Sequence, residues 1–231
     1  MTTEIDVLTL FPGIARGPLK ESILARAQEK KLVRIKVRNL RDYASGRHRV
    51  TDDRPYGGGP GMVMKPEPVF EAVEKLQRRR GNKSWVILMS PTGRRFDQKA
   101  AERLAKKKRL LFLCGHYEGF DQRIHDALAD EEISIGDYIL TNGALAAMVV
   151  VDAVVRLIPG VVGDARSVSR ESFSTGILDH PHYTRPPDFR GKKVPAVLLS
   201  GNHARIQTWR QSEAMARTKK ARRDLIAPDE A

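Results

Sequence analysis

The chain has 231 residues and 41% apolar content, enough to bury the core of one large domain with room for a smaller one. It has no run of eighteen apolar residues, which excludes a membrane-spanning helix, and its opening residues lack the basic segment of a secretory signal. The formal net charge of +13 favours a polyanionic partner such as nucleic acid.

The distribution of charge along the chain and the cysteine content give further information on the partner and the cellular compartment. Residues 111–140 hold one basic residue, Arg123, against seven acidic ones, so a basic protein carries one acidic segment. This contrast suggests that the basic parts of the chain bind a polyanion, while the acidic segment supplies carboxylates to a site. Cys114 is the only cysteine, which rules out a disulfide framework or a cysteine zinc site and indicates a reducing cytoplasm.

The first third of the chain alternates between strand and helix patterns. Residues Ile5–Leu10 form an apolar run typical of a buried strand, ended by Pro12 and Gly13. Apolar residues at helical spacing predict a helix over Leu19–Lys31. Alternating apolar and basic residues over Val33–Arg38 predict a half-exposed strand.

The stretch Thr51–Met64, TDDRPYGGGPGMVM, is the most unusual in the chain. Its glycines can adopt positive φ and leave no Cβ in the way, while Pro55 and Pro60 prevent a helix or central strand. The stretch therefore reads either as a solvated turn or as a loop that something large approaches closely.

The middle of the chain repeats the alternation. Helices are expected over Pro66–Leu76 and, after an Asp97 cap, up to Lys107. Apolar strands are expected over Trp85–Met89, followed by a turn at Ser90–Gly93, and over Leu110–Leu113.

A short helix over Ile124–Leu128, a strand over Ile133–Leu140 and an apolar helix over Leu145–Ile158 complete this part. Unbroken apolar strands alternating with helices predict an α/β fold whose mainly parallel sheet is covered by helices.

The last part of the chain has a different character. Residues 162–173 are poor in large apolar side chains and are expected to form a flexible linker after a first domain of residues 1–161. Residues 174–231 begin with irregular, proline-rich sequence and continue with a helical pattern over Ala204–Ala216. We expect them to form a small, basic, mostly helical domain.

Three loops follow apolar strands at their carboxyl ends, where open α/β sheets bind ligands: Ser90–Gly93, Cys114–Phe120 and Leu140–Gly143. The chain has neither the G-x-G-x-x-G nor the P-loop pattern, so the usual dinucleotide and nucleotide sites are not supported. Its scattered histidines lack the spacing of a zinc site, and we expect no metal centre. Residue patterns alone thus indicate an α/β protein that binds nucleic acid.

Several longer motifs carry a resemblance to a known family. In chain order they are RHRVTDDRPYGGGPGMVM, SPTGRRFDQ, LCGHYEGFDQR, SIGDYILTNG, RLIPGV, LDHPHYTRP and VLLSGNHARI. The chain resembles the bacterial tRNA (guanine-N1)-methyltransferases, which belong to the trefoil-knotted SPOUT methyltransferases. The resemblance runs from about Ile5 to Arg210.

The resemblance implies a knot at the carboxyl end of the first domain and a homodimer with active sites at the subunit interface. It implies S-adenosylmethionine as methyl donor and N1 of the guanosine 3′ of the tRNA anticodon, position 37, as acceptor, a modification that supports the reading frame. It also implies a magnesium requirement, although no metal cage is evident in the sequence.

Matching motifs carry over the residues that would hold the cofactor. They lie in the three loops named above and in the segment Ile135–Leu140, and are Ser90, Pro91, Gly115, Tyr117, Ile135, Gly136, Asp137, Tyr138, Ile139, Leu140, Asn142 and Gly143. Where the family usually reads Gly-Gly-Glu-Leu-Pro, this chain has Asn142 to Ala146, which could alter cofactor affinity or magnesium placement.

The chemistry requires a base for the guanine N1 proton and a cation for the charge that builds on O6. By motif, Glu171 stands where the family has its proposed aspartate base, Arg156 matches the arginine that faces O6, and Glu118 matches a residue that contacts guanine. Asp179 and Glu118 are alternative bases.

RNA binding is assigned to the basic stretch around the glycines and to the second domain. The candidate RNA-binding residues are Arg47, Arg49, Arg54 and Asp179. The linker is expected to become ordered when tRNA binds and to bring Glu171 over the partner subunit's pocket.

Two alternatives remain open at this stage. One is a non-catalytic RNA-binding protein on the same fold, favoured by the aspartate-to-glutamate change at Glu171 and by the altered Asn142–Ala146 loop. The other is a knotted methyltransferase with a different RNA target.

Overall fold

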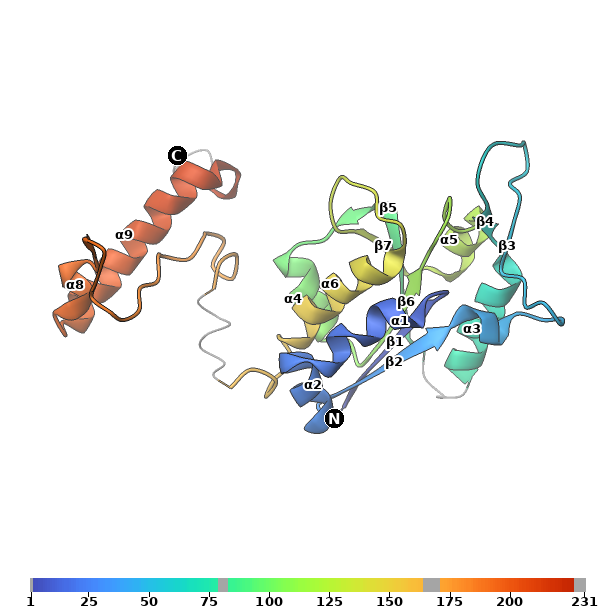
Figure 1. The fold of residues 1–231 in the computed structure, drawn as a ribbon, viewed down its shortest axis with the longest axis horizontal. Coiled ribbons are helices and arrows are strands. Elements are labelled where there is room, and N and C mark those ends of the chain that lie inside the picture. Colours follow the sequence, from blue (N-terminus) through green and yellow to red (C-terminus); the bar gives the residue numbers. More distant parts are fainter. Residues whose placement is uncertain (1, 79–82, 164–170, 227–231) are drawn as a thin grey trace. The chain divides into compact units, whose positions relative to one another are not determined.

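A computed structural model describes residues 2–78, 83–163 and 171–226. The chain divides into two compact units, residues 1–163 and 164–231, and each is described by itself (Figure 1). None of the helices in the described ranges is long and apolar enough to cross a membrane.

The larger unit is built on a five-stranded sheet in the order β2-β1-β6-β5-β7, and every neighbouring pair is parallel. Its strands are β1 (Thr3–Thr9), β2 (Val33–Asn39), β5 (Trp85–Arg95), β6 (Arg109–Cys114) and β7 (Glu131–Ser134). The predicted α/β class with a mainly parallel sheet is confirmed. The knot stays a prediction.

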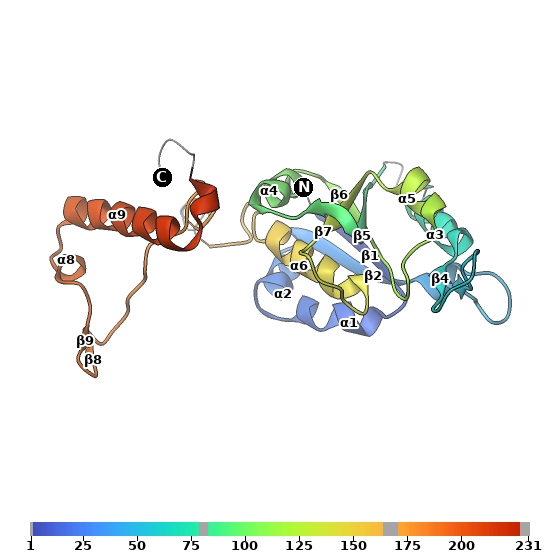
Figure 2. The same cartoon turned by 90° about the horizontal axis from the view of Figure 1, so that it is seen from above.

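Helices cover both faces of this sheet (Figure 2). One face packs against α1 (Pro12–Arg16), η1 (Pro18–Lys20), α2 (Ser22–Glu29), α4 (Gln98–Ala105) and α6 (Gly143–Val155). The other face packs against η2 (Leu40–Tyr43), α3 (Pro66–Arg78) and α5 (Gln122–Leu128).

The sequence of β6 shows why the sheet is buried on both sides. Leu110 and Phe112 enter the core on one face, while Leu111 and Leu113 enter the core on the other. Because side chains alternate across a strand, an unbroken apolar run serves two cores at once. Strand β2 lies at the edge and keeps the predicted alternation, with Arg34 and Lys36 exposed.

Helices α4, α5 and α6 begin at residues whose side chains accept a hydrogen bond from the first turn, as helix N-caps do. Asp97 accepts from the amide of Ala100 at 2.7 Å, which confirms the predicted cap of α4. Asp121 starts α5 in the same way, and Asn142 starts α6.

The structure corrects three boundaries. Strand β5 continues through the expected turn at Ser90–Gly93, which instead forms an irregularity within the strand. Strand β7 ends at Ser134 rather than Leu140. Pro12 and Gly13, expected only to end a strand, begin helix α1, because proline is well suited to the first helical turn.

The glycine stretch contains two short antiparallel strands, β3 (Asp52–Asp53) and β4 (Val63–Met64), and its glycines lie between them. Gly57, Gly58, Gly59 and Gly61 all have positive φ, as the composition predicts.

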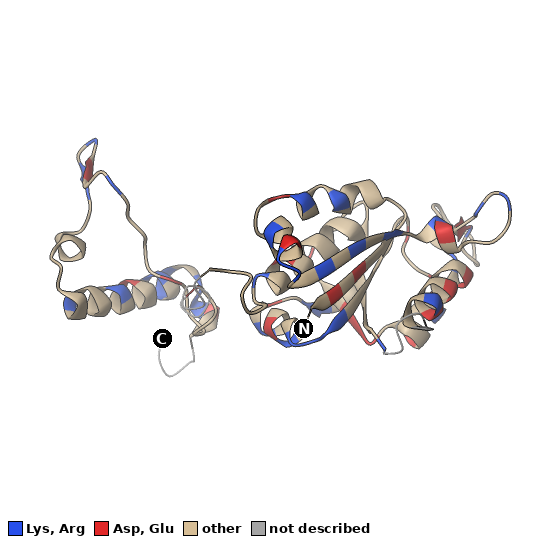
Figure 3. Ribbon diagram, turned by 90° about the horizontal axis from the view of Figure 1, so that it is seen from below, with Lys and Arg blue, Asp and Glu red and all other residues tan. Residues whose placement is uncertain are grey.

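The smaller unit is organised by α9 (His203–Ala221), together with β8 (Asp188–Phe189), β9 (Lys192–Lys193), α8 (Ala196–Leu199) and η3 (Arg223–Leu225). Basic residues occur along the length of α9 (Figure 3). Thr218 is fully buried, and its hydroxyl accepts a hydrogen bond from the amide of Leu178. Most of the expected 162–173 linker, residues 164–170, lies outside the described residues, and the proposed domain boundaries stay predictions.

Candidate active site

The irregular part of β5, at Ser90–Thr92, and the loops that follow β6 and β7 meet at one cavity of about 560 Å³. These three strands are neighbours in the sheet and all run in the same direction, so their carboxyl ends lie together. A cavity of this size falls within the range of small-molecule sites.

Eleven of the twelve predicted cofactor residues line this cavity. They are Ser90, Pro91, Gly115, Tyr117, Ile135, Gly136, Tyr138, Ile139, Leu140, Asn142 and Gly143. Asp137 belongs to the same loop but is exposed and is not part of the lining. Their cofactor role remains a proposal.

Two of the loops pack backbone against backbone at Gly143. Its amide donates a hydrogen bond to the carbonyl of Gly115 at 2.8 Å, and a Cβ on Gly143 would stand 3.0 Å from the Gly115 nitrogen. Asn142 pairs with His116 in an isolated bridge, and its side chain accepts from the amide of Ala144 at 3.0 Å. The asparagine that departs from the family pattern therefore caps α6 at the rim of the cavity.

The glycine stretch forms a second contact with the cavity loops. The amide of Glu118 donates to the carbonyl of Met62 at 3.0 Å, and the amide of Met64 donates to the carbonyl of Gly119 at 2.9 Å. A Cβ on Gly61 would stand 2.5 Å from Oε1 of Glu118. Part of the glycine stretch is thus closely approached by a cavity side chain.

A polar network on the cavity wall was missed by sequence reasoning. Glu132 of β7 accepts from Thr92 at 3.0 Å and faces Nδ1 of His125 at 2.9 Å, and Thr92 Oγ1 lies 2.6 Å from Ser90 Oγ. Burial raises the pKa of Glu132, but hydrogen bonds from His125 and Thr92 outweigh it and leave the pKa below its usual value. The only signal in the sequence was that Glu132 directly precedes the expected strand at Ile133.

The three candidate catalytic residues are separated along the chain. Glu118 lines the cavity. Arg156 caps the carboxyl end of α6, about 20 Å along that helix from Gly143, so one chain does not bring Arg156 to the cavity. Glu171 belongs to the smaller unit, where its carbonyl accepts from the amide of Ser174 at 3.2 Å.

The candidate RNA-binding arginines are exposed. Arg47 and Arg49 lie between η2 and the glycine stretch, and Arg54 lies within that stretch. Arg49 forms an exposed ion pair with Asp42 at 3.4 Å. Such a pair is weak and leaves the arginine available to a phosphate.

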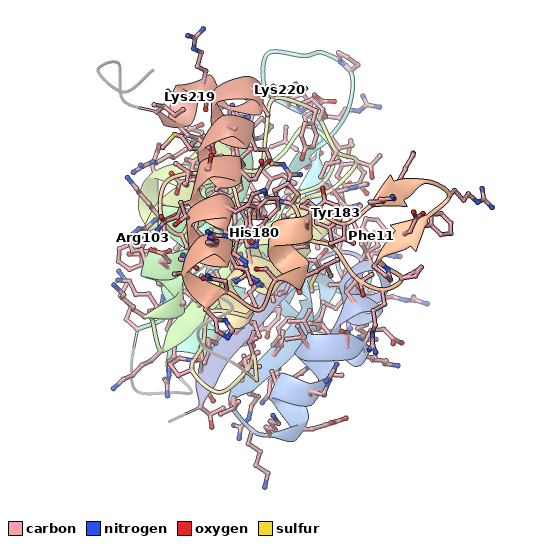
Figure 4. All side chains as sticks on the ribbon, turned by 90° about the vertical axis from the view of Figure 1, so that its left-hand side faces the viewer. Phe11, Arg103, His180, Tyr183, Lys219 and Lys220 are labelled. Atoms are coloured by element: carbon pink, nitrogen blue, oxygen red, sulfur yellow. The ribbon has the colours of Figure 1, made fainter. Side chains whose placement is uncertain are left out.

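Asp179 lies in the smaller unit between two histidines. Its carboxylate oxygens lie 2.6 Å from Nδ1 of His180 and 2.9 Å from Nε2 of His182. Trp209 of α9 makes ring contacts with His180 and with Tyr183, both marked in Figure 4. The atoms of Asp179, His180 and His182 are close enough to share a metal ion, but both histidines already hydrogen bond to the aspartate.

Comparison with known proteins identifies the family. The family model described as tRNA (Guanine-1)-methyltransferase TrmD matches residues 3–228. The chain belongs to this family.

Relatives share more than half of their aligned residues with the chain. A protein of Anoxybacillus flavithermus named tRNA (guanine-N(1)-)-methyltransferase is 56% identical over 223 residues, covering 96% of this chain and 91% of the relative. Proteins of the same name from Dehalococcoides mccartyi and Bacillus cereus are also 56% identical over 223 residues, covering 90% and 91% of their own lengths.

Membership of the tRNA (guanine-1)-methyltransferase family confirms the resemblance stated from the motifs. Two residues named above differ from the usual family pattern: Asn142, which caps α6, and Glu171. Both occur in a chain that the family model matches from residue 3 to residue 228.

Proposed function

We propose that this protein transfers the methyl group of S-adenosylmethionine to N1 of a guanine in tRNA. One observation carries the proposal: a member of the tRNA (guanine-1)-methyltransferase family has its motif residues around a single cavity at the carboxyl ends of adjacent parallel strands. The finer assignment, guanosine 37 beside the anticodon, rests on the resemblance of the motifs.

The cavity suits the proposed cofactor. Its lining combines apolar side chains such as Ile135, Ile139 and Leu140 with backbone groups of Gly115 and Gly136, which can bind an adenine edge and a ribose. The close packing of Gly143 on Gly115 fixes two of these loops relative to each other. When bound, S-adenosylmethionine supplies an electrophilic methyl group on a sulfonium.

The protein must make guanine N1 a nucleophile. In the proposed mechanism the Glu171 carboxylate accepts the N1 proton, a step worth about 10²- to 10⁴-fold in rate. The guanidinium of Arg156 donates hydrogen bonds to O6, where negative charge builds, and Glu118 holds the guanine edge within the cavity.

The exposed face of α6 supports a dimer that completes the site. Leu145 and Val149 are 46% and 52% exposed, and Arg156 follows at helical spacing on the same face. In a two-fold contact between two α6 helices lying antiparallel, the carboxyl end of one helix meets the amino end of the other. Arg156 of one subunit would then lie beside the cavity of the next.

The first experiment tests the reaction. Purified protein is incubated with methyl-labelled S-adenosylmethionine, magnesium and a tRNA transcript with guanosine 3′ of the anticodon, beside a matched transcript with adenosine there. We expect label in the first transcript only, and its loss in Glu171→Ala. Binding of cofactor and tRNA without labelling would instead support a non-catalytic RNA-binding protein.

Mixing two inactive variants tests the shared site. Glu118→Ala and Arg156→Ala are unfolded and refolded together; a mixed dimer then has one intact site, so activity returns to about a quarter of the wild-type level. Without recovery, each site draws both residues from one chain.

Magnesium is not assigned a site, because no carboxylate cluster of the metal-binding kind lies at the cavity among the described residues.

A further inference from the structure

Glu132 joins three elements at the wall of the cavity. Its carboxylate, on β7, contacts Thr92 in the irregular part of β5 and His125 on α5. Ser90, Thr92 and His125 all line the cavity, whereas Glu132 does not. Glu132 therefore acts on the cavity only through its neighbours.

The network has a fixed direction. An ionised carboxylate only accepts hydrogen bonds, so Thr92 must donate its hydroxyl hydrogen to Glu132. Thr92 Oγ1 then has no hydrogen left for Ser90, so the Ser90 hydroxyl donates within the network, either across the 2.6 Å contact to Thr92 or to Glu132 itself. Ser90 Oγ in turn accepts from the amide of Thr92 at 3.2 Å. The hydroxyl hydrogen of Ser90 is consequently used within the network, which leaves Ser90 only acceptor capacity for a molecule in the cavity.

The backbone around this network cannot easily move. A Cβ on Gly93 would stand 2.5 Å from the nitrogen of Ile133 and 2.6 Å from the carbonyl carbon of Glu132, so the two strands are in direct backbone contact there. The lowered pKa of Glu132 keeps its carboxylate ionised at neutral pH. On the other side, the carboxylate fixes His125 with Nδ1 as a donor.

We propose that Glu132 is a positioning residue that makes Ser90 an obligate hydrogen-bond acceptor and orients His125, so that this wall recognises a donor group of the cofactor, such as its ammonium, amino or hydroxyl group. The inference rests on the proposed function. Glutamine at this position has an amide that can donate to Thr92, which allows Thr92 to donate to Ser90 and releases the Ser90 hydrogen towards the cavity. The Ser90 hydroxyl would then present a hydrogen-bond donor to the donor group of the cofactor, and the hydrogen bond between them would be lost.

Calorimetric binding of S-adenosylhomocysteine tests the proposal without requiring turnover. We expect Glu132→Gln to weaken binding roughly tenfold, the size of one lost charge-assisted hydrogen bond. Glu131→Gln is the matched control, because Glu131 is the preceding residue of the same strand but contacts Trp85 and Arg103 instead. It should bind S-adenosylhomocysteine as the wild type does.

A double-mutant cycle separates positioning from a general loss of structure. If Glu132 acts through Ser90, then Glu132→Gln should weaken binding much less in a Ser90→Ala background than in the wild type. In steady-state assays the KM for S-adenosylmethionine should rise with little change in kcat or in the KM for tRNA. Equal binding by Glu132→Gln and the wild type, or additive effects in the cycle, would overturn the positioning role. A wild-type protein that does not bind S-adenosylhomocysteine would instead overturn the proposed function and this inference with it.

Discussion

The side chain of Glu118 occupies the space where a Cβ of Gly61 would stand. The hypothetical Cβ lies 2.5 Å from Oε1, 2.7 Å from Cγ and 2.9 Å from Cδ of Glu118, and Gly61 has a φ of +86°. A glycine in one loop thus sets the position of a carboxylate in another, 57 residues later in the chain. Since Glu118 is a candidate for contact with the guanine, the glycine stretch helps shape the proposed substrate site.

Replacing this glycine should displace the carboxylate. We expect Gly61→Ala to lower the rate of guanine methylation at least tenfold while S-adenosylhomocysteine binding stays near the wild-type value. Gly58→Ala is the control: Gly58 also has a positive φ, but nothing lies within 4 Å of its hypothetical Cβ. Gly58→Ala should lose only about 1–2 kcal/mol of unfolding free energy, because of backbone strain at a positive φ. Equal methylation rates in the two variants would contradict the role of the contact.

Gly143→Ala should act on the cofactor instead. The added methyl would stand 3.0 Å from the backbone nitrogen of Gly115 and 3.1 Å from the Cα of Cys114, and neither atom can move without shifting β6. We expect weaker S-adenosylhomocysteine binding by calorimetry. Gly13→Ala, at an open helical position, should leave binding unchanged. Unaltered binding by Gly143→Ala would show that the two loops tolerate separation.

A charge on the exposed face of α6 should separate the proposed dimer. We expect Val149→Glu to sediment as a monomer and to lose methylation, because the partner's arginine is then absent from each cavity. Val50→Glu is a matched control for the sedimentation measurement, since Val50 and Val149 are both 52% exposed. A Val149→Glu protein that remains dimeric would place the interface elsewhere.

The Asp179 cluster should make stability depend on pH. Burial raises the pKa of Asp179, but hydrogen bonds from His182 and His180 outweigh it and hold the pKa below its usual value. A carboxyl with a lowered folded pKa stabilises the protein above its unfolded pKa, near 3.9, and this contribution is lost as the pH falls through the folded value.

Asp179→Asn should therefore be less stable than the wild type at pH 7, with a difference that shrinks below about pH 4. The measurement is urea unfolding followed by Trp209 fluorescence in a Trp85→Phe background, since the chain has two tryptophans. Asp188→Asn, in the exposed β8 strand, controls for the loss of a surface charge. A difference that is constant from pH 7 to pH 3.5 would rule out the linkage.

Cys114 should be inert in the folded protein. It is fully buried at the end of β6, and burial raises the pKa of its thiol well above the ordinary range. We expect an alkylating reagent to label it only in denaturant, and Thr175→Cys, at an exposed position, to react at once. Rapid labelling of the native wild type would reveal opening next to the cavity.

Much of the fold follows from local pattern. The run Leu110–Leu113 predicts a doubly buried strand because each face of β6 meets an apolar layer, and Asp97 predicts a helix start because its side chain can bind the first turn. The error at β7 has a physical cause. Ile139 and Leu140 extend the apolar run of the strand, yet they line the cavity and are exposed, so their apolar character serves a binding surface instead of the sheet.

The candidate site was predictable only through the motifs. The rule that ligands bind at the carboxyl ends of parallel strands selects the three loops. It does not specify which side chains face the cavity, since this depends on the order of the strands in the sheet. The Glu132 network escaped notice because it links Ser90, Thr92 and His125 across three elements, and no short sequence pattern marks such a contact.

The parallel sheet also has a consequence for how the protein is made. Ile5 pairs with Leu110, so β1 cannot find its neighbour β6 until the ribosome has released about half of the chain. Sheets with such distant pairings form slowly. The cavity loops are held together only after β5, β6 and β7 align, and a cofactor can recognise only chains that have reached this stage. Ligand present during synthesis should therefore protect newly completed molecules by mass action.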